Sequence, residues 1–106
     1  MKVYLIREKS GIKAVGEFSP STNELKVKKG SVVSAEIKYT GKFRGAKSVE
    51  KSRQGVIENN TVIKDVIFKS PSTAANFVTG NSTNGLIAWK DTKGITIKEL
   101  LAKGED

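Results

Sequence analysis

The sequence predicts an α+β fold: an antiparallel sheet of the N-terminal half, with two to three helices from the C-terminal half packed on one face. After a first apolar run, the segments expected as strands within the first 38 residues alternate apolar and polar side chains with a two-residue period. Beyond residue 45 the apolar spacing changes to that of helices. A chain of 106 residues, 37% hydrophobic, can bury one modest core, so we expect residues 1–106 to form a single domain.

Four strands are expected in the first half. Residues 2–7 are apolar on both faces, which is typical of a central strand, and residues 12–18 alternate. Gly16 indicates a bulge or a close backbone approach in the second strand. Residues 25–27 form a short strand that we expect at an edge of the sheet, and residues 33–37 alternate as the fourth. No helix is expected in the first two strands or between them.

Residues 46–59 are expected to form a helix with its valines toward the core and its lysines outside. Gly55 weakens this helix by about 1 kcal/mol relative to alanine. Asn59 and Asn60 would cap its end. The alternative is that the two asparagines form the turn of a β-hairpin. Residues 62–68 are then expected to be extended.

A second helix is expected over residues 70–80. Ser70 can accept hydrogen bonds from the free amides of its first turn, and Pro71 fits the first helical position. Gly80 ends the helix. Phe77 lies on its apolar side and is expected in the core.

Asn84 and Gly85 form a strong turn dipeptide, after which residues 86–89 are expected to be an apolar strand. Trp89 in that strand is expected in the core. Residues 96–103 complete the fold as a helix that begins with a capping box.

The composition argues against catalysis. The chain has no histidine and no cysteine, which removes Ser-His and Cys-His nucleophiles, zinc ribbons and disulfides. Only three aspartates occur, so a carboxylate cage for calcium or magnesium is not expected. We therefore predict that the protein is not an enzyme and has no cofactor and no metal site.

The excess positive charge lies in the first half of the chain. The net charge is +8, and residues 1–54 hold 13 basic and 5 acidic side chains, whereas residues 55–106 hold six of each. The densest stretch is residues 38–53, and a second cluster consists of Lys26, Lys28 and Lys29. Clustered cations can neutralise phosphates, and the interleaved rings of Tyr39 and Phe43 could stack on bases.

From these features we predict a non-catalytic module that contacts nucleic-acid phosphates through a basic face. Ser70 and Ser72 are included because the free amides of a helix start can hold a phosphate, although helix capping also explains them. The expected contact residues are Lys38, Lys42, Arg44, Lys47, Lys51, Arg53, Ser70, Ser72 and Asn84. The alternative is a protein-interaction or assembly module whose lysines only keep it soluble.

No segment indicates secretion or a membrane. The apolar run at residues 3–6 is too short for the core of a signal peptide. No apolar stretch is long enough to span a bilayer. We expect a cytoplasmic protein with no membrane partner.

Three motifs together resemble a known family. They are Val-Lys-Lys-Gly-Ser at residues 27–31, Ser-Pro-Ser followed by paired alanines at residues 70–75, and Asn-Gly followed by tryptophan at residues 84–89. Their order and distances are similar to those of the family catalogued as domain of unknown function 4357. The resemblance covers nearly the whole chain, from the first hairpin at residues 11–18 to the helix at residues 94–100.

The resemblance implies a domain found with GIY-YIG-type nucleases or restriction–modification systems, similar to the restriction-enzyme adenine-methylase-associated module. That family motif contains no catalytic residue. Two positions depart from it: Leu86 stands where an aromatic is frequent, and Asn60 where a glycine is common. Together with the basic face, the resemblance implies a non-catalytic nucleic-acid-binding accessory domain that contacts DNA. No nuclease domain precedes the motif, so we expect the domain to act alone or through a partner such as a nuclease or a methylase.

Overall fold

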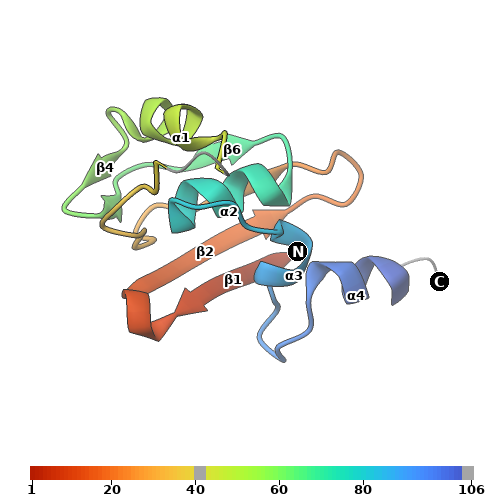
Figure 1. The fold of residues 1–106 in the computed structure, drawn as a ribbon. Helices are drawn as coiled ribbons and strands as arrows, with labels where there is room; N and C mark the ends of the chain where they lie inside the picture. The colour runs from red at the N-terminus through yellow and green to blue at the C-terminus, as the bar shows by residue number, and fades with distance from the viewer. Residues whose placement is uncertain (40–42, 104–106) are drawn as a thin grey trace.

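The chain folds around a four-stranded antiparallel sheet against which its helices pack (Figure 1). The computed structural model describes residues 1–39 and 43–103. In chain order the elements are β1 (Lys2–Arg7), the 3₁₀ turn η1 (Glu8–Ser10), β2 (Ile12–Phe18), β3 (Leu25–Val27), α1 (Ala46–Arg53), β4 (Ile57–Glu58), β5 (Thr61–Val62), β6 (Val66–Phe68), α2 (Pro71–Thr79), α3 (Gly85–Ala88) and α4 (Ile97–Lys103). The sheet order is β1-β2-β3-β6, and β4 pairs with β5 in a separate hairpin. The predicted α+β fold is confirmed.

One helix packs on the sheet, and the other helices pack against it or against its neighbour. α2 packs across β2, β3 and β6. α1 and α3 both pack against α2, and α4 packs against α3. Figure 1 shows α2 and α3 in front of the sheet. The opposite face of the strands carries the alternating exposed positions, such as Lys13 and Glu17 in β2.

β1 and β2 form the expected antiparallel pair, but two details differ from the prediction. β1 is at the end of the sheet instead of its centre, and Ile6 on its outer side is 52% exposed. Beyond β2, the pairing of β1 with other described residues is an isolated bridge, in which the Tyr4 amide donates to the Lys90 carbonyl oxygen over 2.7 Å. A turn of 3₁₀ helix at Glu8–Ser10 closes the hairpin, so the expectation of no helix between the strands is wrong.

β3 is a central strand, and the expectation of an edge position is wrong because β6 pairs along its other side. Residues 33–37 do not form the fourth strand. The Val33 amide donates to the Asn60 carbonyl oxygen over 2.8 Å instead, and the Ser34 amide donates to that of Val78, near the end of α2, over 2.8 Å. Just after this segment, the Lys38 amide donates to the Gly80 carbonyl oxygen over 2.7 Å. The fourth strand is therefore supplied by residues from the second half.

The helix expected over residues 46–59 ends at Arg53. Gly55 has a φ of +75°, which an α-helix cannot contain. Asn59 and Asn60 have φ values of 51° and 61°. Two consecutive residues with positive φ are typical of a tight hairpin turn, so the alternative of a β-hairpin is the correct one here.

The caps predicted for α2 and α4 are confirmed. The Ser70 hydroxyl accepts a hydrogen bond from the Thr73 amide over 3.2 Å, and Gly80 ends α2 in the left-handed conformation. In the last helix the Glu99 amide donates to the Thr96 hydroxyl over 3.2 Å. Residues 86–89, expected as a strand, instead belong to the short helix α3 and its C-cap.

Trp89 and Phe77 are both fully buried, as predicted. The Phe77 ring meets that of Phe68 with 4.8 Å between the centroids. The close approach expected at Gly16 is also present, because a Cβ there would lie 3.2 Å from Cζ3 of Trp89. The core is thus built where α2 and the residue after α3 press on β2 and its neighbours.

Replacing Trp89 with alanine is expected to lower the free energy of unfolding by about 3–5 kcal/mol, because a large buried side chain leaves a cavity. Trp89→Phe keeps most of the apolar packing, so its cost should be smaller. Urea unfolding followed by circular dichroism measures both values. As a control, Ile87→Ala changes a half-exposed side chain next to the core. A cost of Trp89→Ala below about 1 kcal/mol would contradict the burial of this residue.

Candidate nucleic-acid interface

α1 forms the C-terminal half of the basic stretch, and its inner side is apolar. Ala46 and Val49 are buried and form a small cluster with Phe43, against which Ile37 packs. Phe43 is only 5% exposed, so the expectation that its ring could stack on bases is wrong. Tyr39, in contrast, is exposed.

The outer side of α1 carries cations. Lys47 and Lys51 are four residues apart on α1, which places them on the same side of the helix, and Arg44 lies in the turn just before the N-cap Gly45. We call these three cations the row. All three are exposed. No ion pair in the described ranges 1–39 and 43–103 involves any of them. The row is therefore available to an external anion.

The one acidic residue of α1, Glu50, has an internal partner. Its carboxylate accepts a hydrogen bond from the Tyr39 hydroxyl, and this bond raises the pKa of Tyr39 above its usual value. Lys38, next to Tyr39, is exposed, while its backbone is held at the end of α2. Lys42, also among the predicted contact residues, lies outside the described residues.

Arg53 differs from the other cations of the stretch because it turns inward. Its guanidinium donates five hydrogen bonds: to the carbonyl oxygen of Phe77 over 3.0 and 2.7 Å, to that of Val78 over 3.4 Å, and to the carbonyl and hydroxyl oxygens of Ser34 over 3.0 and 2.9 Å. It also lies 5.8 Å from the centroid of the Phe77 ring. Burial lowers the pKa of this guanidinium from its usual value. Arg53 thus joins the end of α1 to the C-terminal carbonyls of α2, where a cation is favoured.

The polar residues predicted from the second half also have internal partners. The Ser72 hydroxyl accepts a hydrogen bond from the Gly85 amide over 2.9 Å, and Asn84 Oδ1 accepts one from the Leu86 amide over 3.1 Å. Ser70 caps α2 and also shares a hydrogen bond with the Thr73 hydroxyl over 2.9 Å. These groups hold the starts of α2 and α3 together.

The same junction contains a very close backbone contact. A Cβ added at Gly85 would overlap the backbone of Pro71 and Ser72, so only glycine fits there. From the interior, the Trp89 indole donates to the Pro71 carbonyl oxygen over 3.1 Å. The Ser-Pro-Ser, Asn-Gly and tryptophan residues therefore form one packing unit. We name it the α2–α3 junction.

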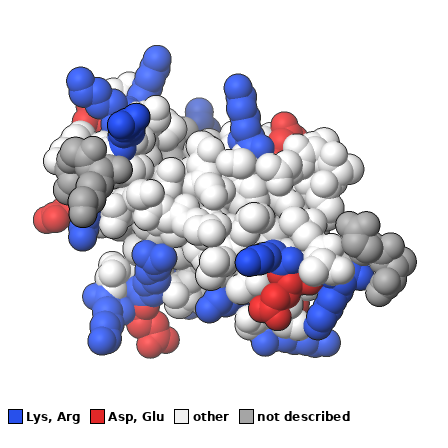
Figure 2. All heavy atoms as spheres, turned by 45° about the vertical axis from the view of Figure 1, so that its right-hand side comes forward, with Lys and Arg blue, Asp and Glu red and all other residues white. Residues whose placement is uncertain are grey.

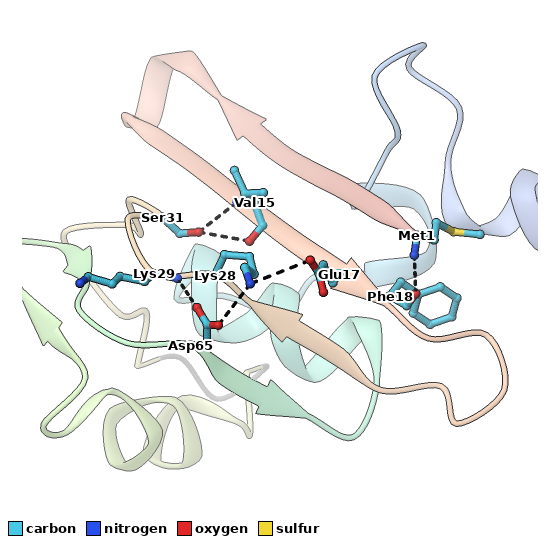
Figure 3. Close-up of polar contacts among 8 residues, drawn as sticks. All are labelled: Met1, Val15, Glu17, Phe18, Lys28, Lys29, Ser31 and Asp65. Carbon is cyan, nitrogen blue, oxygen red and sulfur yellow. Dashed lines mark hydrogen bonds and ion pairs between the residues drawn. The ribbon is translucent and has the colours of Figure 1, made fainter.

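The cluster of Lys26, Lys28 and Lys29 is partly neutralised (Figure 3). Lys28 Nζ lies 3.2 Å from the Asp65 carboxylate and 3.9 Å from that of Glu17. Asp65 also accepts a hydrogen bond from the Lys29 amide over 2.8 Å. This amide and the Lys28 side chain hold the pKa of Asp65 below its usual value. Lys28 is therefore a structural cation, which the sequence pattern did not distinguish from its neighbours.

The loop that follows these lysines is anchored to β2. The Val15 amide donates to the buried Ser31 hydroxyl over 2.9 Å, and this hydroxyl lies 3.3 Å from the Val15 carbonyl oxygen (Figure 3). Val32 bridges both Lys13 and Thr61. Lys29 remains exposed on this loop.

Comparison with known families now identifies the group to which this arrangement belongs. The sequence matches the family model described as "Domain of unknown function (DUF4357)" over residues 4–101. The chain belongs to this family. The α2–α3 junction lies entirely within the matched DUF4357 region. Neither the curated proteins nor the solved structures contain a match to the chain.

The described residues of this DUF4357 chain contain no group of three or more acidic, histidine or cysteine side chains placed to hold a metal ion. None of their helices has the length and apolar character needed to cross a bilayer.

Arg53→Leu is expected to lower the free energy of unfolding by about 1.5–3 kcal/mol, since hydrogen bonds from a charged group to helix carbonyls are lost. Lys51→Leu, on the exposed side of the same helix, should change it by less than about 0.5 kcal/mol. Urea titration of both variants measures the difference. Equal effects of the two substitutions would show that the Arg53 contacts contribute nothing.

Asp65 predicts a pH dependence of stability. Because folding lowers its pKa, its ionised form stabilises the fold above the unfolded-state value of about 3.9, and this contribution is lost as pH falls through the folded value. Asp65→Asn should therefore be less stable than the wild type at neutral pH, and the difference should shrink toward pH 2. Urea midpoints at several pH values test this. A difference that is constant with pH would contradict it.

Proposed function

We propose that this DUF4357 domain is a non-catalytic nucleic-acid-binding accessory domain that contacts the DNA phosphate backbone through the outer side of α1. The observation that carries the proposal is the row of Arg44, Lys47 and Lys51, exposed and without acidic partners in the described parts of the chain. Exposed cations on a helix are the groups that neutralise phosphates and release their counterions.

The way α1 is held supports this use of the row. Arg53 bonds the end of the helix to α2, and Val49 packs its inner side into the apolar cluster. A helix fixed in this way presents its cations at a constant spacing. Such contacts position a protein on nucleic acid without reading the bases.

Other parts of the proposal rest on composition and family resemblance. The absence of histidine and cysteine from the sequence supports a non-catalytic role. The resemblance to domains that accompany nucleases and methylases supports an accessory role beside such an enzyme in the cytoplasm.

A second candidate function, a protein-interaction module, is favoured by a different surface. Ile67 and Ile6 are 60% and 52% exposed on the outer face of the sheet. Beside Ile67 lies a shallow pocket of about 360 Å³, which is lined by apolar residues such as Met1 and Pro20 and also by the charged residues Glu17, Glu24 and Lys26. Exposed apolar side chains around a depression are typical of a protein-binding surface.

The triple variant Arg44→Ala, Lys47→Ala, Lys51→Ala should weaken binding to duplex DNA of any sequence. It should also lower the slope of log affinity against log salt by roughly 3, about one for each phosphate contact removed. Fluorescence anisotropy with a labelled duplex at several salt concentrations measures both quantities.

The matched control is the triple variant Lys2→Ala, Lys13→Ala, Lys26→Ala, which removes the same charge from the outer face of the sheet. It should retain most of the wild-type affinity and slope. If both variants lose the same affinity and salt slope relative to the wild type, the effect is one of net charge alone. If neither differs from the wild type, or the wild type binds no DNA, the protein-interaction function is preferred.

A further inference from the structure

One segment of this highly charged chain carries no charge at all. None of the 19 basic and 11 acidic side chains lies between Ser70 and Trp89. This segment comprises α2, α3 and their connecting loop. The exposed sides of helices usually carry charged residues, so their absence from two successive helices requires an explanation.

The segment forms a continuous uncharged surface. α2 and α3 face the viewer in Figure 1, and Figure 2 shows white surface across this side of the molecule, with Lys and Arg side chains and several Asp and Glu side chains above and below it. We name this surface the neutral band. Its side chains with exposed or half-exposed surface include Thr73, Asn76, Ser82, Asn84 and Ile87.

Cations lie on elements at both sides of the neutral band. On one side α1 packs against α2 and carries Lys47 and Lys51. On the other side α3 packs against α4, which carries Lys98, and Lys90 follows directly after α3. No ion pair between described residues engages any of these four lysines.

The polar groups of the neutral band are suited to recognition. Asn76 and Asn84 each use the side-chain oxygen internally, which orients the amide, and no described hydrogen bond uses their NH₂ groups. No hydrogen bond of the described part of the chain uses the Ser82 hydroxyl. Ile87, 50% exposed, offers an apolar contact between them.

We propose that the neutral band lies against a groove of duplex DNA, with its uncharged side chains toward the base edges and the lysines of α1 and of residues 90–98 on the two phosphate strands. This inference rests on the proposed function and adds which face of the domain meets the duplex. Amide and hydroxyl groups bond base edges, an aliphatic side chain meets the thymine methyl group, and flanking cations take the phosphates.

The neutral band favours a duplex over other partners. Single-stranded nucleic acid is held largely by stacking on exposed aromatic rings, and both aromatic residues of the segment, Phe77 and Trp89, are fully buried. A protein partner is favoured by a large apolar patch, whereas the only strongly exposed large apolar side chain of this segment is Ile87 among the described residues.

The test compares two carboxylates placed on opposite faces. Ile87→Glu puts one in the neutral band, and Ile67→Glu puts an identical one on the outer face of the sheet, where the native side chain is similarly exposed. Against a labelled 20-base-pair duplex, Ile87→Glu should weaken binding by about tenfold or more, and Ile67→Glu by less than about threefold, because repulsion acts mainly at close range. Circular dichroism verifies that both variants fold.

Ser82→Glu, in the loop between α2 and α3, provides a second variant that does not touch the core and should behave like Ile87→Glu. Lys98→Ala and Lys47→Ala should each lower the salt slope by about one. If the wild type binds no DNA, the proposed function and this inference both fail. If the wild type binds but Ile67→Glu is the damaging change, or single-stranded DNA binds more tightly than the duplex, only the orientation is overturned.

Discussion

The close contact between the start of α2 and the start of α3 is the constraint on which the second half of the fold depends. Gly85 approaches the backbone of Pro71 so closely that no side chain fits between them, and the Trp89 indole donates to the Pro71 carbonyl oxygen from within. Because the Trp89 ring also lies over Gly16 of β2, the same contact attaches both helices to the sheet. The residues that carry the family resemblance therefore have a structural role in packing, and this role does not depend on any external partner.

A second contact determines how the basic stretch is displayed. Arg53 reaches from the end of α1 to the last carbonyls of α2, whose partial negative charge favours a cation. The helix is thereby fixed with Val49 inward and the row of Arg44, Lys47 and Lys51 outward. One arginine of the stretch is thus structural, and this role makes the remaining cations available at defined positions.

The distribution of charge follows from the same division of roles. Lys28 is held by Asp65 and Glu17 near the middle of the sheet, while the cations of α1 and those after α3 have no such partners among the described residues. The neutral band of α2 and α3 lies between the cations of α1 and the cations that follow α3 (Figure 2). An uncharged polar surface bordered by cations without such partners is complementary to duplex DNA, whose groove lies between two phosphate strands. This complementarity links the proposed DNA binding to the face of the domain that meets the duplex.

Local chemistry was sufficient to predict the α+β class, the caps of α2 at Ser70 and Gly80, and the burial of Trp89, because alternation, capping and side-chain size act over a few residues. It did not predict which segments become neighbours. Residues 33–37 alternate like a strand, yet the Val33 amide bonds Asn60 and the Ser34 amide bonds Val78 near the end of α2. Residues 86–89 look like a strand but are drawn into α3 and its C-cap by the contact of Gly85 with Pro71. Arg53 looks like the other cations of its stretch, and only the nearby carbonyls of α2 make it structural. Such partners come from distant parts of the chain. The tertiary structure alone therefore decides which strand-like segment becomes a strand and which cation becomes structural.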